Sequence, residues 1–473
     1  MCHPGHPKAK ILMASGSRCL LLCLLVLVSC SHTVASASLR AGGTDTLDNV
    51  FPHKAVDDPC EKEFDTEKLD AVFVQFMQKH ARKYSHGTEE YHKRRVLFHR
   101  RAMEVERHNC ETHHTWDAVV NKFADRTDEE MSRLRGYKSS ARPQESSAHR
   151  DGPQAQAAQL LGTRATVGIS DLPESFSWRN LTSIQEVQDQ GGCGSCWAFA
   201  AATTMRAHRE IWMKEPKKFS VQQIVSCTPN PRACGGTGGC NGATAELAMD
   251  YVYKRGCKSE EELPYSASDA TCQDEEDDSF LEERAQARGG HLDSMPNTRR
   301  LRRVRPIADR VSFPSQAQAN SHTGMTGWTK LPENKLAPLM AALYYNGPVS
   351  VSISAGYSWN QYGTGILGAK NCPKDAIIDH AVVLIGYGEA QVKKKKMPYW
   401  LLMNSWGYDW GENGYIRIER RKAKEDKYCG TDTDPEIGSG CKGGPPTVWV
   451  CGMCGILYDT VIPHFEDRRG SSL

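Results

Sequence analysis

The chain has 473 residues, which is enough for about three domains and a substantial core. Its 59 Lys and Arg residues nearly balance its 57 Asp and Glu residues, and the formal net charge is +2. This balance gives no electrostatic case for a nucleic-acid partner or for binding to an acidic membrane surface.

The first 37 residues have the form of a secretory signal peptide. Three basic residues precede an apolar run from Cys19 to Val28, and Ala35-Ser-Ala37 resembles a small-residue cleavage site. A signal anchor is the alternative, but the run is short for a bilayer and no later stretch approaches membrane length, so we expect no stable membrane span. We therefore predict a signal peptide over 1–37, entry into the secretory pathway, and disulfides as the main use of the 18 cysteines.

Two helical patterns occupy residues 66–109. Apolar residues recur at helical spacing from Leu69 to His80, and a second helix is expected from about Glu89 to Asn109. The second helix matches most of the ERFNIN pattern of cathepsin L-type propeptides, with Arg101 where that pattern has Asn. The matching residues are Glu90, Arg94, Phe98, Val105 and Asn109. An ordinary charged helical hairpin is the alternative.

A second motif follows in the order that such propeptides have. Asn121-Lys-Phe-Ala-Asp125 resembles their Gly-x-Asn-x-Phe-x-Asp motif, with Val119 replacing the Gly. The resemblance implies a propeptide over 38–137, whose helical domain at about 66–127 inhibits the rest of the chain in cis.

The next segment is predicted to be a linker that is cut during maturation. Residues 138–168 are rich in Ser, Ala, Gln, Arg and Gly without periodicity, which is typical of an exposed linker. Leu172-Pro-Glu-Ser-Phe-Ser-Trp178 resembles the mature start of papain-like enzymes, which predicts a linker and cleavage region over 138–171. Asn180 begins a sequon for glycosylation, Asn180-Leu-Thr182.

The candidate nucleophile lies in the run from Gln190 to Phe199. Glycines at 191, 192 and 194 permit a tight turn, and Cys196 then opens a pattern with helical spacing. Free N–H groups and the positive end of the helix would stabilise a thiolate there, which lowers its pKa from about 8.5. A redox pair or half of a zinc site is the alternative for Cys193-Gly-Ser-Cys196. Neither a thioredoxin-like context nor a second ligand pair at zinc-finger spacing accompanies it, and the run resembles the papain and cathepsin signature.

Two insertions are expected in the remainder of the chain. The segment 273–326 opens acidic and later turns basic, with few aromatic residues, which predicts a disordered surface insertion. The basic run within it could be a processing site or a solvated loop. A second departure from the family pattern covers 422–450. Lys393–Lys396 are predicted to lie on a hairpin between two strands.

A His and an Asn complete the candidate site. From Asn346 the apolar residues alternate with period two, which predicts antiparallel strands. His380 begins one strand and Asn404 follows the next, so a hairpin can bring both together. They follow Cys196 by more than the ~130–150 residues usual for papain-like enzymes, and the 273–326 insertion accounts for the excess.

Together these motifs resemble a papain-family cysteine protease of the cathepsin L type, made as a zymogen. The resemblance implies an α+β fold with a helical lobe and an antiparallel β-barrel-like lobe over 172–473, preceded by a small helical propeptide domain. It implies a cysteine-type endopeptidase in which Cys196 is the nucleophile and His380 its ion-pair partner and later general acid. Asn404 would orient the imidazole, and Gln190 would form the oxyanion hole with the N–H of Cys196.

The same resemblance implies further site residues. Gly194, Gly242 and Ala243 would meet the substrate backbone, with Ala243 in place of the usual second Gly. Trp406 would shield the His–Asn contact, and Asp459 would lie at the floor of the pocket for the P2 side chain, the main determinant of specificity. Exposure of Asp459 to solvent is the alternative.

The expected partners follow from the enzyme class. Peptides and proteins are the substrates, the propeptide is an inhibitor in cis, and cystatin-type inhibitors are possible binders of a monomeric enzyme. No metal or organic cofactor is expected, and the compartment is a lysosome- or vacuole-like acidic one or the extracellular space.

The resemblance also implies three disulfides in the mature part. They are Cys193–Cys240, Cys227–Cys272 and Cys372–Cys454. Five further cysteines remain when Cys196 is reduced, so at least one stays outside intramolecular pairs of this part. Cys234 with Cys257 is the pairing that we predict for a fourth bridge, and the region 422–450 is expected to hold one more.

Two other function classes stay open at this point. A binding protein on an inactive protease fold would lack one of the catalytic residues, whereas all four are present. An exopeptidase would need a device that holds a substrate terminus. No added His-rich loop is visible in the mature part, and the long propeptide favours an endopeptidase.

Overall fold

The computed structural model describes Cys60 and residues 66–136, 169–272 and 323–468. The chain divides into two units, Met1–Asp57 and Asp58–Leu473, and the first lies outside the described residues. The predictions for the signal peptide, for residues 138–168 of the linker and for most of the 273–326 insertion therefore fall outside the described part.

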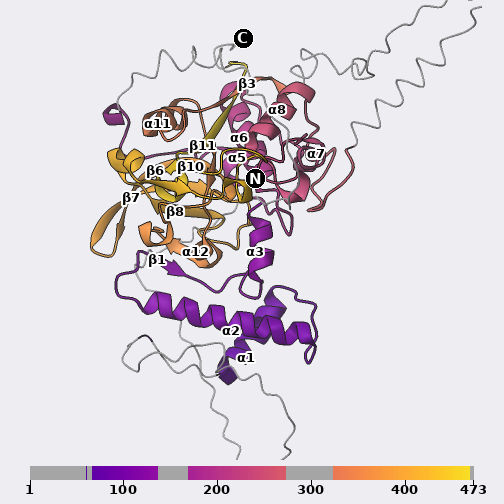
Figure 1. Cartoon of the computed structure of the whole chain (residues 1–473), viewed down its shortest axis with the longest axis vertical. Helices are drawn as coiled ribbons and strands as arrows, with labels where there is room; N and C mark the ends of the chain where they lie inside the picture. Colours follow the sequence, from indigo (N-terminus) through magenta and orange to yellow (C-terminus); the bar gives the residue numbers. More distant parts are fainter. Residues whose placement is uncertain (1–59, 61–65, 137–168, 273–322, 469–473) are drawn as a thin grey trace, which may run out of the picture. The chain divides into compact units, whose positions relative to one another are not determined.

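The propeptide begins with the two helices that the sequence predicts. They are α1 (Thr66–Lys79) and α2 (Glu89–Cys110), which pack against each other (Figure 1). Thr88 caps α2 by accepting a hydrogen bond from the Tyr91 N–H, and Phe73 and Phe98 are fully buried between the helices. A disulfide from Cys60 to Cys110 closes the end of α2, and no motif in the sequence predicts that pair.

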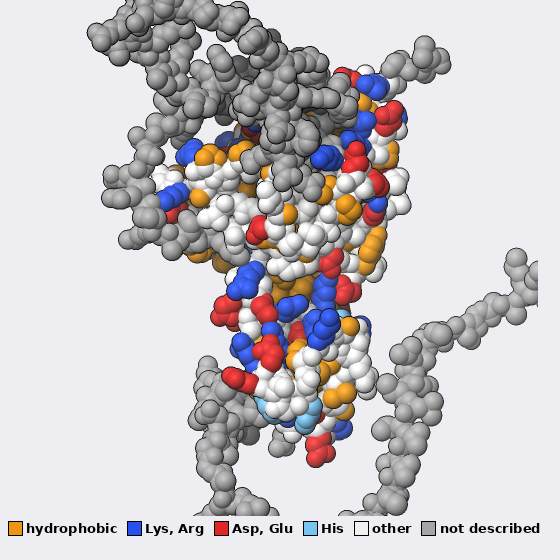
Figure 2. Space-filling model, turned by 90° about the vertical axis from the view of Figure 1, so that its right-hand side faces the viewer, with side chains coloured by type: hydrophobic (Ala, Val, Ile, Leu, Met, Phe, Trp, Pro, Cys, Tyr) orange, Lys and Arg blue, Asp and Glu red, His pale blue; other side chains and the backbone are white. Residues whose placement is uncertain are grey.

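Ion pairs fix the rest of the propeptide to α2. Helix α3 (Asp128–Leu134) starts with a capping box between Thr127 and Glu130. Glu130 also binds the Arg94 guanidinium of α2 with both oxygens, at 2.5 and 2.8 Å. Figure 2 shows basic and acidic side chains interspersed over the face that it presents. These contacts hold the start of α3 against α2.

The helical lobe of the peptidase part is built around one long helix. Helix α6 (Cys196–Met213) is buried over most of its length, and Trp197, Ala201 and Met205 are fully covered. Shorter helices pack around it. They are α5 (Thr182–Gln185), α7 (Val221–Cys227) and α8 (Ala245–Arg255). Helix α6 therefore forms the centre of this lobe.

An antiparallel sheet forms the second lobe. Its strand order is β3-β11-β4-β6-β7-β8, and β2 is an additional short strand that pairs with β6. The strands are β2 (Phe176–Ser177), β3 (Met325–Lys330), β4 (Val349–Ile353), β6 (His380–Val392), β7 (Lys395–Met403), β8 (Tyr415–Glu419) and β11 (Asp459–Phe465). Helices α11 (Leu336–Tyr345) and α12 (Tyr357–Gln361) belong to the same lobe. Strand β6 also packs on α6, so the two lobes meet where both elements begin.

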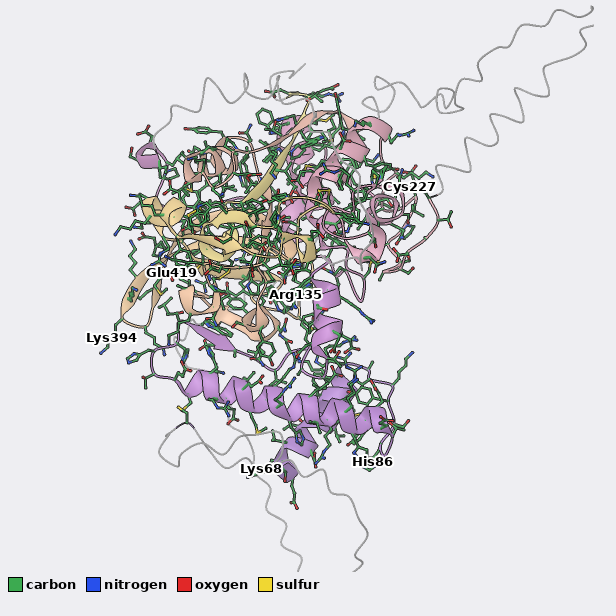
Figure 3. The ribbon with its side chains drawn as sticks, in the orientation of Figure 1. Lys68, His86, Arg135, Cys227, Lys394 and Glu419 are labelled. Atoms are coloured by element: carbon green, nitrogen blue, oxygen red, sulfur yellow. A yellow bond between two sulfur atoms is a disulfide. The ribbon has the colours of Figure 1, made fainter. Side chains whose placement is uncertain are left out.

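Two predicted boundaries can be compared with the structure. Strand β3 starts at Met325, so the predicted insertion extends too far at its C-terminal end. Lys394 lies at the tip of the β6–β7 hairpin, as predicted (Figure 3). The 422–450 region contains two short strands, β9 (Cys429–Asp432) and β10 (Val448–Cys451), which pair antiparallel.

The structure contains the three implied disulfides but not the fourth that we predicted. Cys234 pairs with Cys441, not with Cys257, and Cys429 pairs with Cys451. The long second insertion returns to the loop that holds Cys234, and no local pattern reports such a contact. Cys257 lies outside the described bridges as a buried thiol that donates to the Ser220 carbonyl.

The propeptide also adds a strand to the peptidase part. Strand β1 (Trp116–Ala118) pairs antiparallel with β5 (Tyr362–Gly365), and Asn121 donates to the Asn360 carbonyl at 2.8 Å. Across the described ranges, none of the helices is long and apolar enough to cross a membrane.

Candidate active site

The candidate nucleophile is the first residue of α6. Ser195 precedes the helix and shares a 2.6 Å hydrogen bond with Tyr265, which fixes the turn. At Gly194 a Cβ would clash with the carbonyl oxygens of Cys240 and Arg133, so only glycine fits there. Cys196 is fully buried. The helix start predicted from the glycine-rich turn is therefore present.

His380 and Asn404 meet as the hairpin predicts. His380 opens β6, and Asn404 directly follows β7, its antiparallel neighbour. The imidazole Nε2 and the amide Oδ1 lie 2.8 Å apart. Because an amide oxygen can only accept, Nε2 carries the proton, and Nδ1 keeps the lone pair that can take a proton from a thiol.

Trp406 covers this pair from one side. Its ring centroid lies 5.0 Å from that of His380, and only 1% of the residue is exposed. Phe123 of the propeptide packs edge-on against the same indole, at 5.4 Å. Trp406 thus packs over the His380 ring, and Phe123 of the propeptide packs on Trp406 in turn.

The Gln190 side chain is held in one orientation. Its Oε1 accepts a 2.6 Å hydrogen bond from the Ser405 hydroxyl, so the amide Nε2 faces the other way. Nε2 donates to the Leu134 carbonyl at 2.7 Å and to the Cys193 carbonyl at 2.8 Å. The donor expected to bind a substrate oxygen therefore binds a carbonyl of the propeptide.

The propeptide covers the nucleophile directly after α3. The Cys196 thiol donates to the Arg135 carbonyl at 3.1 Å, and Arg135 lies where α3 meets the peptidase lobes (Figure 3). Gly136 has φ +76°, and a Cβ there would clash with the Cys196 sulfur. A Cβ on Gly242 would clash with the Gly136 carbonyl. Residues 134–136 thus run across Gln190, Cys196 and Gly242 in that order.

Burial sets the protonation of the covered pair. It raises the pKa of the Cys196 thiol to about 12, despite the helix start, and lowers the pKa of the His380 imidazole to about 4. In the zymogen the two groups are therefore a neutral thiol and a neutral imidazole. The lowered thiol pKa that the helix position favours is not found in this state, because the propeptide keeps water from the sulfur.

Asp379 binds the propeptide next to His380. Its carboxylate makes a 2.8 Å ion pair with Arg135 and accepts a 2.8 Å hydrogen bond from the Ala355 N–H. Burial raises the pKa of this carboxyl to about 6, and Arg135 opposes that rise. Asp379 directly precedes His380 in the sequence, yet no local pattern indicates its contact with Arg135.

Asp459 is buried and already has a cation beside it. Only 6% of the residue is exposed, so it does not point into solvent. Lys330 lies 3.1 Å from its Oδ1, and Ser352 donates to Oδ2 at 2.6 Å. Glu246, in the first turn of α8, lies 3.8 Å from the same ammonium. The sequence could not indicate Lys330 or Glu246, because they are distant along the chain.

The carboxyls of this cluster have opposite shifts. Burial and the neighbouring Asp459 charge raise the pKa of Glu246. Burial also acts on Asp459, but Lys330 outweighs it and lowers the pKa of that carboxyl. In acid, Glu246 therefore carries a proton, whereas Asp459 stays ionised beside the Lys330 ammonium.

The remaining sequence-predicted residues are also in the described part. Ala243 is fully buried beside Gly242, and Asn180 is exposed. Glycosylation at Asn180 stays a prediction. Within the described ranges, no group of three or more His, Cys, Asp and Glu side chains could hold a metal ion.

Comparison with known proteins gives two family matches. Residues 172–439 match the model described as papain family cysteine protease, and residues 73–131 match the cathepsin propeptide inhibitor domain. Procathepsin L of Mus musculus is 30% identical over 380 residues, 78% of this chain and 92% of that protein. Procathepsin L of Rattus norvegicus is likewise 30% identical, over 381 residues and the same shares of both chains.

Solved structures share the fold. Digestive procathepsin L2 proteinase of Tenebrio molitor has a TM-score of 0.57 at 24% identity, covering 84% of this chain and 100% of that one. A recombinant stem bromelain precursor has a TM-score of 0.56 at 22% identity, with coverage of 84% and 99%.

The fold and the covered Cys–His–Asn site define a cysteine endopeptidase zymogen that carries its own inhibitory propeptide. The chain belongs to the papain family of cysteine proteases, and it is of the cathepsin L type.

Proposed function

We propose that Cys196 attacks the substrate carbonyl after its proton passes to Nδ1 of His380. His380 then protonates the departing amine, and water releases the acyl-enzyme. Asn404 holds the imidazole in the required tautomer through the 2.8 Å contact with Nε2. The observation that carries this assignment is the Cys196 thiol bound to a propeptide carbonyl, 3.1 Å away, where a substrate carbonyl would lie.

The proposed oxyanion hole consists of the Gln190 side chain and the N–H of Cys196. Support comes from the 2.7 Å hydrogen bond that Gln190 Nε2 donates to the Leu134 carbonyl oxygen. Loss of one such donor costs about 3–4 kcal/mol of transition-state stabilisation.

Substrate binding is proposed to follow the line of the propeptide. Gly194, Gly242 and Ala243 would meet the backbone of the substrate, and Trp406 would keep water from the His–Asn contact. The close approach of Gly136 to Gly194 and Gly242 supports this line.

The P2 side chain would reach the Asp459 cluster. Ser352, which donates to Asp459, pairs across the sheet with Ala381, the neighbour of His380. Because Lys330 already neutralises one carboxylate, a basic P2 side chain would gain from the cluster mainly when Glu246 is ionised as well.

Working conditions and partners complete the proposal. An acidic compartment of the secretory pathway, lysosome- or vacuole-like, or the extracellular space fits the cysteine-rich chain and its propeptide. The enzyme would act as a monomer and would bind cystatin-type inhibitors. Maturation would cut close to residue 171.

The test is the substitution Cys196→Ala in the full chain, activated in acid. Peptide hydrolysis and labelling by a thiol-directed epoxide should both be lost. Cys257→Ser, at the other thiol outside the described bridges, is the matched control and should keep both. Substantial turnover by a homogeneous Cys196→Ala preparation would overturn the assignment.

A further inference from the structure

The second insertion links the helical lobe to the β lobe. These lobes form the two walls on either side of propeptide residues 134–136. Residues 433–447, here called the strap, leave the β lobe after β9 and return to it at β10. Between these strands the strap reaches the helical lobe, where Cys441 forms a disulfide with Cys234. The strap therefore connects the lobes covalently.

Backbone hydrogen bonds fasten the strap on both sides. On the helical-lobe side, the Gly235 N–H donates to the Gly440 carbonyl at 2.9 Å, and the Lys442 N–H donates to the Arg232 carbonyl at 3.0 Å. On the β-lobe side, the Ser439 N–H donates to the Ile378 carbonyl at 2.8 Å. Adjacent strap residues thus bind opposite walls.

Both attachment points lie next to the residues that hold the propeptide. Ile378 precedes Asp379, which pairs with Arg135. On the other wall, a Cβ on Gly242 would clash with the carbonyls of both Gly136 and Gly235. The strap is therefore directly beyond Gly136 on the line that runs from Gln190 past Cys196 to Gly242.

The strap crosses from one lobe to the other at the protein surface. Lys442 and Gly443 are exposed, whereas Gly438 is buried against Ile378. At Gly438 the strap lies directly on the β-lobe wall, because a Cβ there would clash with the Ile378 carbonyl. A substrate chain that follows the propeptide line past Gly242 would meet the strap.

We propose that the strap limits the length of substrate on the acyl side of the cleaved bond. This inference rests on the proposed role of Gly242 and Ala243, which places the second residue before that bond beside them. The third residue and those before it cannot then continue in extended form between the lobes. The favoured substrates are peptides whose free amino end lies close to the cleaved bond, and long acyl segments are cut slowly while the Cys234–Cys441 bridge is intact.

The test compares two fluorogenic peptides with the same two residues before the cleaved bond. One peptide begins with that pair, and the other carries four more residues on its amino side. For the acid-activated full chain, we expect kcat/KM for the short peptide to exceed that for the extended one at least about tenfold. In the double variant C234S/C441S, the ratio should fall toward one.

The control is C429S/C451S, which removes a bridge inside the β lobe and leaves the two walls connected. It should keep the wild-type ratio. Equal cleavage of both peptides by the wild-type enzyme would overturn the inference without any variant, and so would an unchanged ratio in C234S/C441S. Failure to cut either peptide, with Cys196 unlabelled by the epoxide, would overturn the proposed function itself and the strap inference with it.

Discussion

Glu130→Gln tests whether acid opens the site by weakening α3. Gln can still accept the 2.8 Å hydrogen bond from the Thr127 N–H, but it loses the charge that binds Arg94. Burial acts to raise the pKa of Glu130, yet the bonds from Arg94 and Thr127 lower it from 4.5 to about 2. The substitution therefore removes an ion pair and leaves the cap.

The free energy that the Glu130 ion pair contributes follows from that pKa. Lowering the pKa of Glu130 from 4.5 to about 2 corresponds to about 3 kcal/mol, since a tenfold change in the ionisation equilibrium is worth about 1.36 kcal/mol. Because 25% of the Glu130 side chain stays exposed, solvent screening reduces the contribution to about 1–2 kcal/mol. A lowered carboxyl pKa stabilises the folded form above about pH 4.5, and this stabilisation is lost as the pH falls toward 2.

The assay follows alkylation of Cys196 in the full chain by a small thiol reagent at early times, across pH 3 to 7. In Glu130→Gln, Cys196 should become reactive at a higher pH than in the wild type, since α3 starts less stable. Glu90→Gln is the control, because Glu90 binds the same Arg94 from a side chain that is 48% exposed, worth ~0.5 kcal/mol. Identical pH profiles for Glu130→Gln and the wild type would refute the reasoning.

Three further substitutions test separate parts of the site. Gly136→Ala should raise early alkylation of Cys196 at neutral pH because the new Cβ meets the sulfur, whereas Gly87→Ala, with a similar positive φ in open space, should not. The ratio of the cleavage rates of P2-Arg and P2-Leu substrates should rise with pH, since each carboxyl that ionises adds one negative charge to the Asp459 cluster. Glu246→Gln should flatten this rise. A ratio that still climbs in the variant would contradict the proposed role of Glu246. Asn404→Ala should lower kcat ~10–100-fold with little change in KM, and an equal kcat would contradict the positioning role.

The positions of the proposed catalytic residues could be predicted because each lies in a contiguous motif. The glycine-rich turn before Cys196 forces the helix start, and the period-two strands bring His380 and Asn404 to neighbouring strand ends. The propeptide helices were equally clear from their apolar spacing.

What the sequence could not provide depends on contacts between distant segments. The pairing of Cys234 with Cys441 joins two loops of different lobes, and cysteine spacing alone does not determine connectivity. The neutral state of Cys196 and His380 arises from burial beneath residues 134–136. The local sequence favours a thiolate because it predicts the helix start at Cys196. It carries no information on the propeptide residues that cover the sulfur.

Acid does not weaken all the carboxylate contacts of the propeptide equally. The pKa of Asp379 is raised to about 6 by burial, so its ionised form is disfavoured in the zymogen. A raised carboxyl pKa means that protonation does not weaken this state, and the Arg135 contact does not drive opening in acid. That role falls to carboxylates with lowered pKa values, Asp70 and Glu130, which stabilise the propeptide helices.

The most direct measurement is to map the thiol that a cysteine-directed epoxide labels in the full chain, before and after acid treatment. We predict no label at neutral pH, while the propeptide carbonyl of Arg135 covers the sulfur, and one label after acid treatment, on the peptide that contains Cys196. Label on another cysteine, or equal labelling of Cys196 before acid treatment, would contradict it.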